Sequence, residues 1–478
     1  MRYLFTTLLL LVGMLRLSGA PSGDRLNVLF IATDDLRTNL GCYGDPVAKT
    51  PNLDNLAKRG VRFDRAYCQQ ALCNPSRSSL LTGLRPDTIK VWNLPTHFRD
   101  NVPDVITLPQ HFKNNGYFAQ DIGKIFHNWR TEVQGDPESW SVPAVMHFAT
   151  HNSDVAIVDD GQVPASFTET KGTEAREVPD EAYFDGRVAA KAIEALRSMS
   201  QKDKPFFLAV GFWKPHLPFN PPKRYWDMYR RDQIPPIEHP SPPLGAPNIA
   251  AHDANEGMAE TVTDLENQLV LRHGYYAATS FVDAQIGKVV AELDRLGLAE
   301  NTVVVLWSDH GFHLGEQGLW GKTSNYELDA RVPLIIAAPG YVQNRTSAGL
   351  VELLDLYPTL VELCGLPAVE GLEGESIEPL LADPNRRGKP AAFTQHPRPA
   401  HMKVFGEVMG YSMRTDRYRY TEWRDWKSGD VLGLELYDHD TDRGETVNLA
   451  GQINLISAQR GLAQQLGQQF PRQGLPAK

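Results

Sequence analysis

LNVLFIATDD, residues 26–35, joins an apolar run of strand length to two aspartates. An unbroken apolar run of this length is typical of a strand that is buried on both faces of a parallel sheet. Four similar runs follow along the chain, and amphipathic helices alternate with them. The pattern predicts an α/β fold, in which a large, mainly parallel or mixed sheet is sandwiched by helices.

The predicted elements cover most of the chain up to residue 363. The other strands are expected at Tyr117–Ile122, Phe206–Phe212, Thr302–Trp307 and Leu334–Ala338. The helices are expected at Asn52–Arg59, Leu108–Asn115, Glu181–Met199, Leu265–Leu296 and Val351–Leu363. From about His396 the pattern changes to short strands rich in Tyr, Arg and Trp, which predicts a small antiparallel sheet at the C-terminus.

Composition excludes several classes of protein. Of the 478 residues, 42% are apolar and 22% are charged, which excludes collagen, a coiled coil and a protein with many membrane spans. The 48 basic side chains and 58 acidic ones give a net charge of −10, which argues against nucleic acid as a partner. Four cysteines, at positions 42, 68, 73 and 364, are too few for a disulfide scaffold.

Residues 1–20 have the pattern of an export signal: a basic start, an apolar run at 4–15 and small residues at 18–20. We expect cleavage after Ala20 and a location in the periplasm, in a lumen or outside the cell. An uncleaved membrane anchor is the alternative, but Arg16 shortens the apolar run below the ~20 residues that a spanning helix needs. No stable membrane insertion is expected after cleavage.

Ionisable residues follow four of the predicted strands directly. They are Asp34 and Asp35, Lys124 and His127, Lys214 and His216, and Asp309 and His310. Because the carboxyl ends of parallel strands meet at one edge of a sheet, we expect these side chains to lie close together. The structural alternative is that the aspartates cap helices, the histidines pack in the core and the lysines are solvated.

A cation would reconcile the carboxylates at this edge. Asp34, Asp35 and Asp309 would repel one another there unless a metal joined them. Oxygen ligands favour Ca²⁺ or Mg²⁺, and numerous, irregular ligands favour Ca²⁺. His310 is also compatible with Mn²⁺ or Zn²⁺.

The sharpest motif is CNPSRSSLLTG at residues 73–83. Asn74 is a good helix N-cap and Pro75 a good first helical residue, so a helix is expected to begin just after Cys73. Its N-terminus would favour an anion, and Arg77 has the wrong sign for the helix dipole unless an anion or a carboxylate cluster compensates it. From the residues alone, Cys73 is either a thiolate nucleophile or an inert buried cysteine.

The run C-x-P-S-R-x-x-x-L-T-G resembles the signature of the type I sulfatases of the alkaline phosphatase superfamily, in which this cysteine is converted to Cα-formylglycine. Among sulfatases, the local patterns are most similar to the iduronate-2-sulfatase branch, in which a His follows the metal-binding Asp. The similarity covers nearly the whole mature chain and is carried by residues 34–37, 41–44, 123–127, 214–216, 308–311, 321–322 and 411–415.

The resemblance implies a set of site residues. The ligands of one divalent cation, usually Ca²⁺, would be Asp34, Asp35, Asp309, His310 and the modified Cys73. Arg77 and Lys124 would hold the formylglycine, with His127 beside it. His216 and Lys322 would face the sulfate and the leaving oxygen. An enzyme that generates formylglycine is an implied partner.

The resemblance also implies domains, a reaction and a substrate. Residues 25–390 would form the catalytic α/β domain and residues 391–478 the C-terminal subdomain. The reaction would be hydrolysis of a sulfate ester through a sulfo-enzyme intermediate on the formylglycine made from Cys73. The substrate would be a sulfated saccharide, with a 2-O-sulfated uronic acid of a glycosaminoglycan or another polysaccharide as the expected unit.

Two segments with little periodicity, at 128–179 and 234–257, are expected to form much of the substrate pocket. Residues near the C-terminus have two interpretations, sugar contacts or a twisted sheet, of which the pattern favours the sheet. They are Arg398, Lys403, Arg414, Tyr418, Tyr420 and Trp423.

Two other functions stay open at this point. A formylglycine-dependent phosphodiesterase or phosphonate hydrolase shares the cysteine motif, and a non-catalytic protein that binds sulfated glycans would leave Cys73 unmodified. A zinc phosphatase is disfavoured, because no Ser or Thr stands at the nucleophile position. If Cys73 is modified, at least one of the three other cysteines is expected to be a free thiol unless it pairs between chains.

Overall fold

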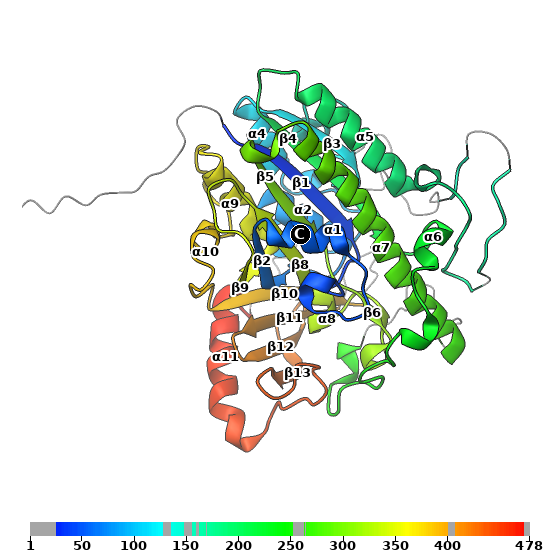
Figure 1. Cartoon of the computed structure of the whole chain (residues 1–478). Coiled ribbons are helices and arrows are strands. Elements are labelled where there is room, and N and C mark those ends of the chain that lie inside the picture. The colour runs from blue at the N-terminus through cyan, green and yellow to red at the C-terminus, as the bar shows by residue number, and fades with distance from the viewer. Residues whose placement is uncertain are drawn as a thin grey trace, which may run out of the picture.

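A computed structural model describes residues 25–127, 135–147, 155–158, 162–168, 170–251, 262, 264–399 and 407–472. The predicted export signal and Lys403 lie outside these residues. A seven-stranded sheet and a four-stranded sheet dominate the molecule, and the smaller one lies beside one end of the larger (Figure 1). Within the part of the chain that is described, no helix is long and apolar enough to cross a membrane.

The large sheet is mixed. Most neighbouring strands run parallel, but β8 is antiparallel to both of its neighbours, β5 and β2. In spatial order the strands are β3 (Phe118–Gly123), β4 (Phe206–Pro215), β1 (Asn27–Asp34), β5 (Thr302–Ser308), β8 (Arg331–Ala337), β2 (Val61–Tyr67) and β9 (Arg345–Glu352). The strand that opens the chain, β1, therefore lies between β4 and β5 inside the sheet.

Helices cover both faces of this sheet (Figure 1). One face packs against α2, α4 and α9, and the other against α1, α5 and α7. The helices of this part of the chain are α1 (Pro51–Lys58), α2 (Cys73–Thr82), α3 (Pro86–Ile89), α4 (Leu108–Asn114), α5 (Phe184–Met199), α6 (Lys223–Trp226), α7 (Leu265–Arg295), α8 (Glu327–Ala330), α9 (Leu356–Leu363) and α10 (Glu378–Ala382).

Strand β1 shows why its sequence is apolar throughout. Val28 and Phe30 point into one core, whereas Leu29 and Ile31 point into the other, and all four are fully buried. Complete burial of each such side chain contributes about 1.5–3 kcal/mol of hydrophobic free energy. The strand is thus anchored on both faces, which fixes the position of the aspartates at its end.

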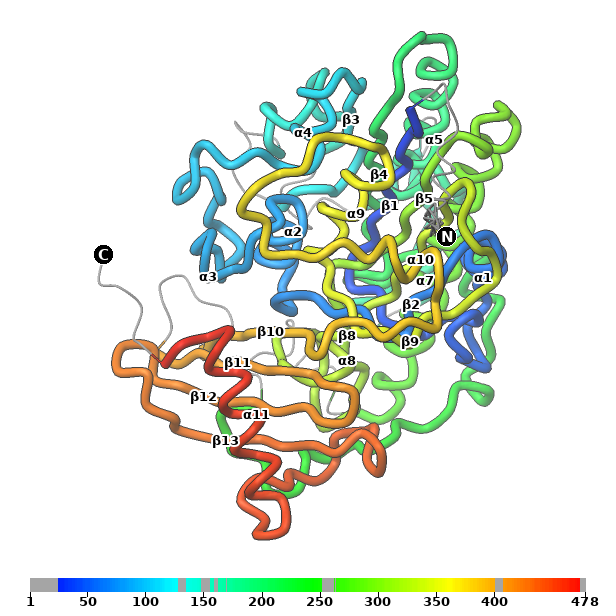
Figure 2. The backbone as a smooth tube through the Cα atoms, turned by 90° about the vertical axis from the view of Figure 1, so that its left-hand side faces the viewer, coloured from blue at the N-terminus to red at the C-terminus, as the bar shows by residue number. Residues whose placement is uncertain are grey.

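The C-terminal sheet is antiparallel and its strands follow chain order. They are β10 (Ala391–Arg398), β11 (Val408–Thr415), β12 (Tyr418–Asp425) and β13 (Val431–Asp438). Helix α11 (Ile456–Gln469) lies across this sheet, where Leu462 and Leu466 pack against Met409 and Met413 (Figure 2). Tyr420 and Trp423 are buried in the sheet, as the interpretation of this region as a twisted sheet predicts.

The α/β sandwich and the small C-terminal antiparallel sheet are both confirmed, and the predicted strands and most of the helices agree with the structure to within a few residues. One helix was predicted too long: residues 351–352 belong to β9, and α9 begins only at Leu356. Strands β2 and β9 were not predicted, because charged and other polar residues interrupt their apolar positions.

Candidate functional site

Four neighbouring strands bring their carboxyl ends to one place. Because β3, β4, β1 and β5 are adjacent and parallel, the residues that follow them converge at one edge of the large sheet. The cluster of charges was predicted at this edge. Strand β1 ends in Asp34, and Asp35 follows it in a left-handed conformation with φ of 62°. A non-glycine residue in this conformation is strained, and such strain is characteristic of functional sites.

Four potential ligands meet at this edge: Asp34, Asp35, Cys73 and His310. Each offers one ligand atom that lies within 4.8 Å of the others, and all four residues are buried. The Cys73 Sγ atom is 3.4 Å from both Asp34 Oδ1 and His310 Nε2. His310 Nδ1 lies 2.9 Å from the Gly311 carbonyl oxygen, so Nδ1 carries the proton and the Nε2 lone pair faces the cluster. Burial lowers the pKa of His310, which favours the neutral form that binds metals.

Asp309, the fifth predicted ligand, lies beside this group and not within it. Its Oδ2 accepts a hydrogen bond from Arg77 Nε at 2.8 Å, and its Oδ1 accepts from the backbone N–H groups of Asp35 and His310 at 3.2 and 3.0 Å. In this structure the carboxylate orients Arg77. Its role as a metal ligand stays a prediction.

Arg77, the fifth residue of α2, is completely buried. Besides Asp309, its guanidinium donates to the carbonyl oxygens of Lys124 at 2.5 Å and Thr33 at 3.1 Å, and it lies 3.7 Å from Asp34 Oδ1. The Asp309 and Asp34 carboxylates keep the pKa of Arg77 above its usual value although burial opposes this. The nearby carboxylates thus compensate the burial of a cation near the start of the helix.

Two lysines pair with the two aspartates at the end of β1, Asp34 and Asp35. Lys124 Nζ donates to Asp34, and Lys322 Nζ donates to both oxygens of Asp35 at 2.8 and 3.1 Å. Both lysines are almost completely buried. Lys322 follows directly after β7 (Trp320–Gly321), a short strand that pairs with β6 (His313–Leu314). Each carboxylate is therefore already neutralised by one ammonium group, so a divalent cation added here makes the site positive and suited to an anion.

His216 faces the same carboxylates from the end of β4. Its Nδ1 donates to the Leu217 carbonyl oxygen at 2.6 Å, and its Nε2 lies 3.7 Å from Asp35 Oδ2. Lys214 Nζ donates to the carbonyl oxygens of His216 and Pro218 and so stabilises the segment that follows β4. His127 is buried three residues beyond Lys124, and the segment that follows it lies outside the described residues.

The helix at the cysteine motif begins two residues earlier than predicted, since Pro75 was expected to be its first residue. Cys73 is the first residue of α2, and Leu72 occupies the N-cap position without a side-chain hydrogen bond. The prediction that Asn74 is the N-cap is wrong, because its amide donates instead to the carbonyl oxygens of Asn93, Leu94 and Thr96. Burial and the Asp34 carboxylate raise the pKa of Cys73 well above its usual value, so the unmodified thiol is protonated at neutral pH. None of the four cysteines forms a disulfide.

The donor set fits a divalent cation. Two carboxylates and an imidazole nitrogen with a free lone pair surround position 73, which offers an oxygen after conversion of the cysteine to formylglycine. Carboxylate oxygens favour a hard cation such as Ca²⁺ or Mg²⁺, although the imidazole also suits softer ions. The residues present are therefore compatible with the cofactors that the sequence motif implies.

Several supporting residues could not be recognised in the sequence. Ser308 accepts a hydrogen bond from the Leu36 N–H group and donates to the His310 carbonyl, each at 3.0 Å. Thr323, next to Lys322, has φ of 87°, which is unusual for a β-branched residue, and its carbonyl oxygen accepts from Arg398 at 2.9 Å. Ser308 belongs to a motif that carries the family resemblance, and Thr323 is only adjacent to a candidate site residue, so neither signal identified these roles.

Two buried titratable groups lie at the outer side of β3. Asp121 is fully buried and neither of its carboxylate oxygens has a hydrogen-bond partner within the described structure, so burial raises its pKa to about 8. His147 lacks partners for both ring nitrogens there, and burial together with Lys124 lowers its pKa to about 4. Both side chains face Gly135: its missing Cβ would lie 3.7 Å from Asp121 Oδ2 and 3.6 Å from His147 Nδ1.

Comparisons with known proteins provide independent information. A family profile described as Sulfatase matches residues 26–366, and one described as N-sulphoglucosamine sulphohydrolase, C-terminal, matches residues 315–471. Iduronate 2-sulfatase of Mus musculus is 34% identical over 501 aligned positions, which cover 89% of this chain and 90% of that protein.

Two solved structures have the same fold. A protein in complex with its substrate D-glucosamine-2-N,6-O-disulfate superimposes with a TM-score of 0.72 at 24% identity, covering 94% of this chain and 98% of the other. Phosphonate monoester hydrolase from Silicibacter pomeroyi superimposes with a TM-score of 0.73 at 22% identity, covering 95% and 96%. At these identities the likeness establishes the fold alone.

Proposed function

The chain belongs to the sulfatase family, whose members hydrolyse sulfate esters, and we propose that its substrate is a 2-O-sulfated uronic acid of a polysaccharide. The observation that carries the reaction is the buried group of Asp34, Asp35, Cys73 and His310 at the end of β1. The similarity to iduronate 2-sulfatase of Mus musculus supports the choice of sugar. We further propose that the protein acts after export, in the periplasm, in a lumen or outside the cell, since its substrate is a polysaccharide.

Two groups that the family implies would complete the site. A divalent cation, most simply Ca²⁺, would supply positive charge beside the sulfate oxygens, and formylglycine at position 73 would supply the oxygen nucleophile that attacks sulfur. The ligands proposed for the cation are Asp34, Asp35, Asp309, His310 and the converted Cys73. An enzyme that makes formylglycine is a required partner in this proposal.

Arg77, Lys124 and Lys322 are proposed to bind and polarise the sulfate group. All three are cations held in fixed positions by buried carboxylates. Charges that are oriented before the substrate arrives stabilise the transition state without a cost of reorganisation, and removing one such group typically lowers the rate by about 10²–10³-fold.

His216 is proposed to protonate the leaving oxygen of the sugar. Because its Nδ1–H bond to the Leu217 carbonyl is retained, the proton that it transfers resides on Nε2, the atom that faces Asp35. His127, beside Lys124 in sequence, is proposed to accept the proton whose loss expels sulfate and restores the aldehyde at position 73. Each histidine thus has one proposed role in proton transfer.

Release of inorganic sulfate from matched disaccharides tests the substrate. Two disaccharides that differ only in whether the sulfate is on the uronate 2-O or on the glucosamine 6-O are incubated with protein expressed together with a formylglycine-generating enzyme. We expect release from the 2-O isomer alone, measured by ion chromatography. Release from neither isomer, with continued hydrolysis of an aryl sulfate, would remove the substrate and leave the reaction class intact.

Cys73→Ala and Cys42→Ala provide a matched pair of variants for this assay. Cys42 is a half-buried cysteine outside the ligand group, and its substitution is expected to leave sulfate release unchanged. Cys73→Ala is expected to abolish release. Faster hydrolysis of aryl phosphate or phosphonate esters than of aryl sulfate would instead favour the phosphonate hydrolase alternative.

A further inference from the structure

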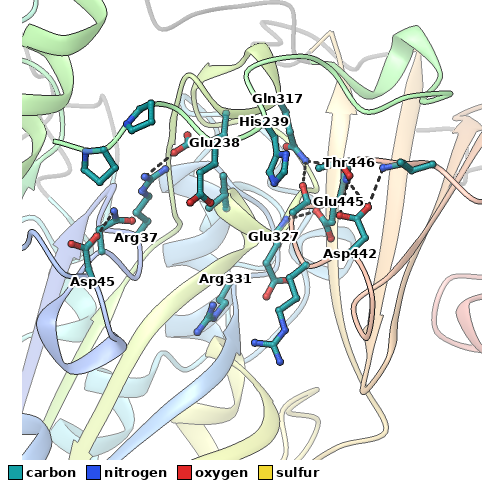
Figure 3. Close-up of a pocket in the computed structure, with 18 of the residues that line it drawn as sticks. Arg37, Asp45, Glu238, His239, Gln317, Glu327, Arg331, Asp442, Glu445 and Thr446 are labelled. Atoms are coloured by element: carbon teal, nitrogen blue, oxygen red, sulfur yellow. Dashed lines mark hydrogen bonds and ion pairs between the residues drawn. The ribbon is translucent and has the colours of Figure 1, made fainter.

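A large pocket lies apart from the ligand group around Cys73, between the α/β part of the molecule and the loop that follows β13 (Figure 3). Its volume is about 1150 Å³. Arg37 and Asp45 line one side of it, and Glu445 and Thr446 line the opposite side (Figure 3). Cavities of several hundred Å³ are large enough for a drug-sized ligand, so this one accommodates a disaccharide.

A hydrogen-bonded partition separates the pocket from the proposed catalytic edge, which is the edge of the large sheet at which Asp34, Asp35 and Cys73 lie. Arg37 forms an ion pair with Glu316 at 2.9 Å, and its backbone N–H group donates to the Tyr275 hydroxyl at 3.0 Å. The Tyr275 hydroxyl in turn donates to the Asp35 carbonyl oxygen at 2.7 Å. None of the residues proposed for catalysis or metal binding lines the pocket.

Arg272, on α7, lines this pocket and is only 6% exposed. One of its terminal nitrogens donates to the Pro235 carbonyl oxygen, whereas its Nε is buried without a partner. Among the described residues, no carboxylate oxygen lies within the 4 Å that defines an ion pair with it. Burial lowers the pKa of Arg272 in spite of the Glu316 carboxylate nearby. A buried guanidinium normally has an anionic partner, because its desolvation is otherwise uncompensated.

The carboxylates that line the pocket are mostly engaged elsewhere. Glu316 pairs with Arg37, and Glu327 and Glu445 both pair with Arg419 at 2.5 Å. Asp442 accepts the backbone N–H groups of residues 446 and 447 at 2.7 and 3.0 Å. Glu238 also lines the pocket, and its exposed carboxylate has neither an ion pair nor a hydrogen bond among the described contacts.

Two further cations also line the pocket. Arg331 and Arg443 have no carboxylate within ion-pair distance in the described part of the chain. Together with Arg272 they leave positive charge available for a ligand. A guanidinium presents a planar fork of N–H groups that matches the oxygens of a carboxylate or a sulfate.

The geometry points to a second saccharide-binding site centred on Arg272, which holds a carboxylated or sulfated sugar unit in this pocket. Proline and tyrosine rings, from Pro46, Pro235, Pro236 and Tyr276, supply flat apolar surface for a sugar ring. The inference that Arg272 binds an anion rests on the burial of its guanidinium without an anionic partner among the described residues. The choice of a saccharide as that anion rests on the proposed function.

Calorimetric titration tests this site with two probes, a 2-O-sulfated uronate disaccharide and inorganic sulfate. Protein with unmodified Cys73 is used so that the disaccharide is bound and not consumed. We expect Arg272→Met to weaken one of two binding events for the disaccharide by at least about tenfold, the typical effect of truncating a buried charged partner. Arg295→Met is the control, since Arg295 is an exposed residue of the same helix that pairs with Glu292.

Three results would overturn the inference. The first is identical disaccharide isotherms for Arg272→Met and the control. The second is an Arg272→Met effect on the sulfate isotherm alone, which would identify a site for a small anion and not for a sugar. The third is a marked loss of thermal stability in Arg272→Met, because removal of an unpaired buried cation is expected to leave stability unchanged or raise it.

The test also separates this inference from the proposed function. Binding that depends on Arg272 is measured without turnover, so it survives if the mature enzyme releases no sulfate from the 2-O-sulfated disaccharide. Conversely, sulfate release with normal kinetics in Arg272→Met agrees with a binding site that is distinct from the catalytic edge.

Discussion

Replacement of Asp121 by Asn is expected to stabilise the protein in a manner that depends on pH. The carboxyl group is buried on β3 without a hydrogen-bond partner in the described structure, which raises its pKa from 3.8 to about 8. The folded state therefore binds a proton that the unfolded state has released at neutral pH. Stability from this group is fully present below about pH 4 and is lost as the pH rises towards 8, since the unfolded state then binds fewer protons than the folded state.

The magnitude follows from the difference between the two pKa values. At pH 7 the pH is about 3 units above the pKa of the carboxyl group in the unfolded chain, so this group is ionised there. In the folded protein the same group is still mostly protonated. A difference of one pKa unit corresponds to about 1.4 kcal/mol. At pH 7 the free energy of unfolding of the wild-type protein is therefore about 4 kcal/mol lower than that of a variant in which residue 121 does not titrate. An asparagine side chain has the size and polarity of a protonated carboxyl group, so Asp121→Asn retains the packing but removes this loss.

Urea unfolding at pH 5, 6, 7 and 8 measures the difference. The advantage of Asp121→Asn in free energy of unfolding is expected to be small near pH 4, to grow by about 1.4 kcal/mol per pH unit and to level off above pH 8. Asp203→Asn, at an exposed site, is the control and is expected to give no such slope. The reasoning is refuted if the advantage is independent of pH, or if the variant is the less stable protein at pH 7.

Three further predictions concern the catalytic edge. Lys322→Met is expected to lower kcat/KM for an aryl sulfate by at least about 10²-fold, because a buried ammonium beside Asp35 is lost. Lys202→Met, at an exposed site, is the control and is expected to change kcat/KM little; equal rates for the two variants would contradict the role of Lys322. His216→Asn is expected to slow sugar sulfates far more than nitrophenyl sulfates, because a poor leaving group depends more on its proton donor; equal losses would exclude His216 as the acid. Treatment with a chelator is expected to lower both Tm and activity, since bound metal stabilises the folded state, and added Ca²⁺ is expected to restore both. An unchanged Tm would argue against a metal at Asp34 and Asp35.

The main features of the catalytic edge could be predicted from the sequence, because they depend on local pattern and on simple sheet geometry. An apolar run that ends in Asp34 places these charges at the carboxyl end of a buried strand. Parallel neighbours then bring Lys124, His216 and His310 to the same edge. Pro75 in the first turn of α2 likewise marks the start of a helix.

Other features could not be predicted, because they arise from contacts between distant segments. Whether Asp309 faces a metal or Arg77 depends on how two segments 232 residues apart in sequence meet. The lack of an anionic partner for Arg272 among the described residues depends on Glu316, which has paired with Arg37 instead. The missed strand β2 contains Arg62, Asp64 and Arg65, whose charges hide the alternation of its buried residues.

The central claim is that Cys73 lies in a sulfate-ester hydrolase site and works only after conversion to formylglycine. One measurement tests it most directly: the aryl sulfatase rate of several preparations, set against the fraction of the Cys73 peptide that mass spectrometry finds as the aldehyde. Expression with different amounts of the formylglycine-generating enzyme provides the range of conversion. The predicted result is a rate proportional to the aldehyde fraction, which extrapolates to zero for the thiol. Full activity in a preparation whose Cys73 is entirely unmodified would contradict the account.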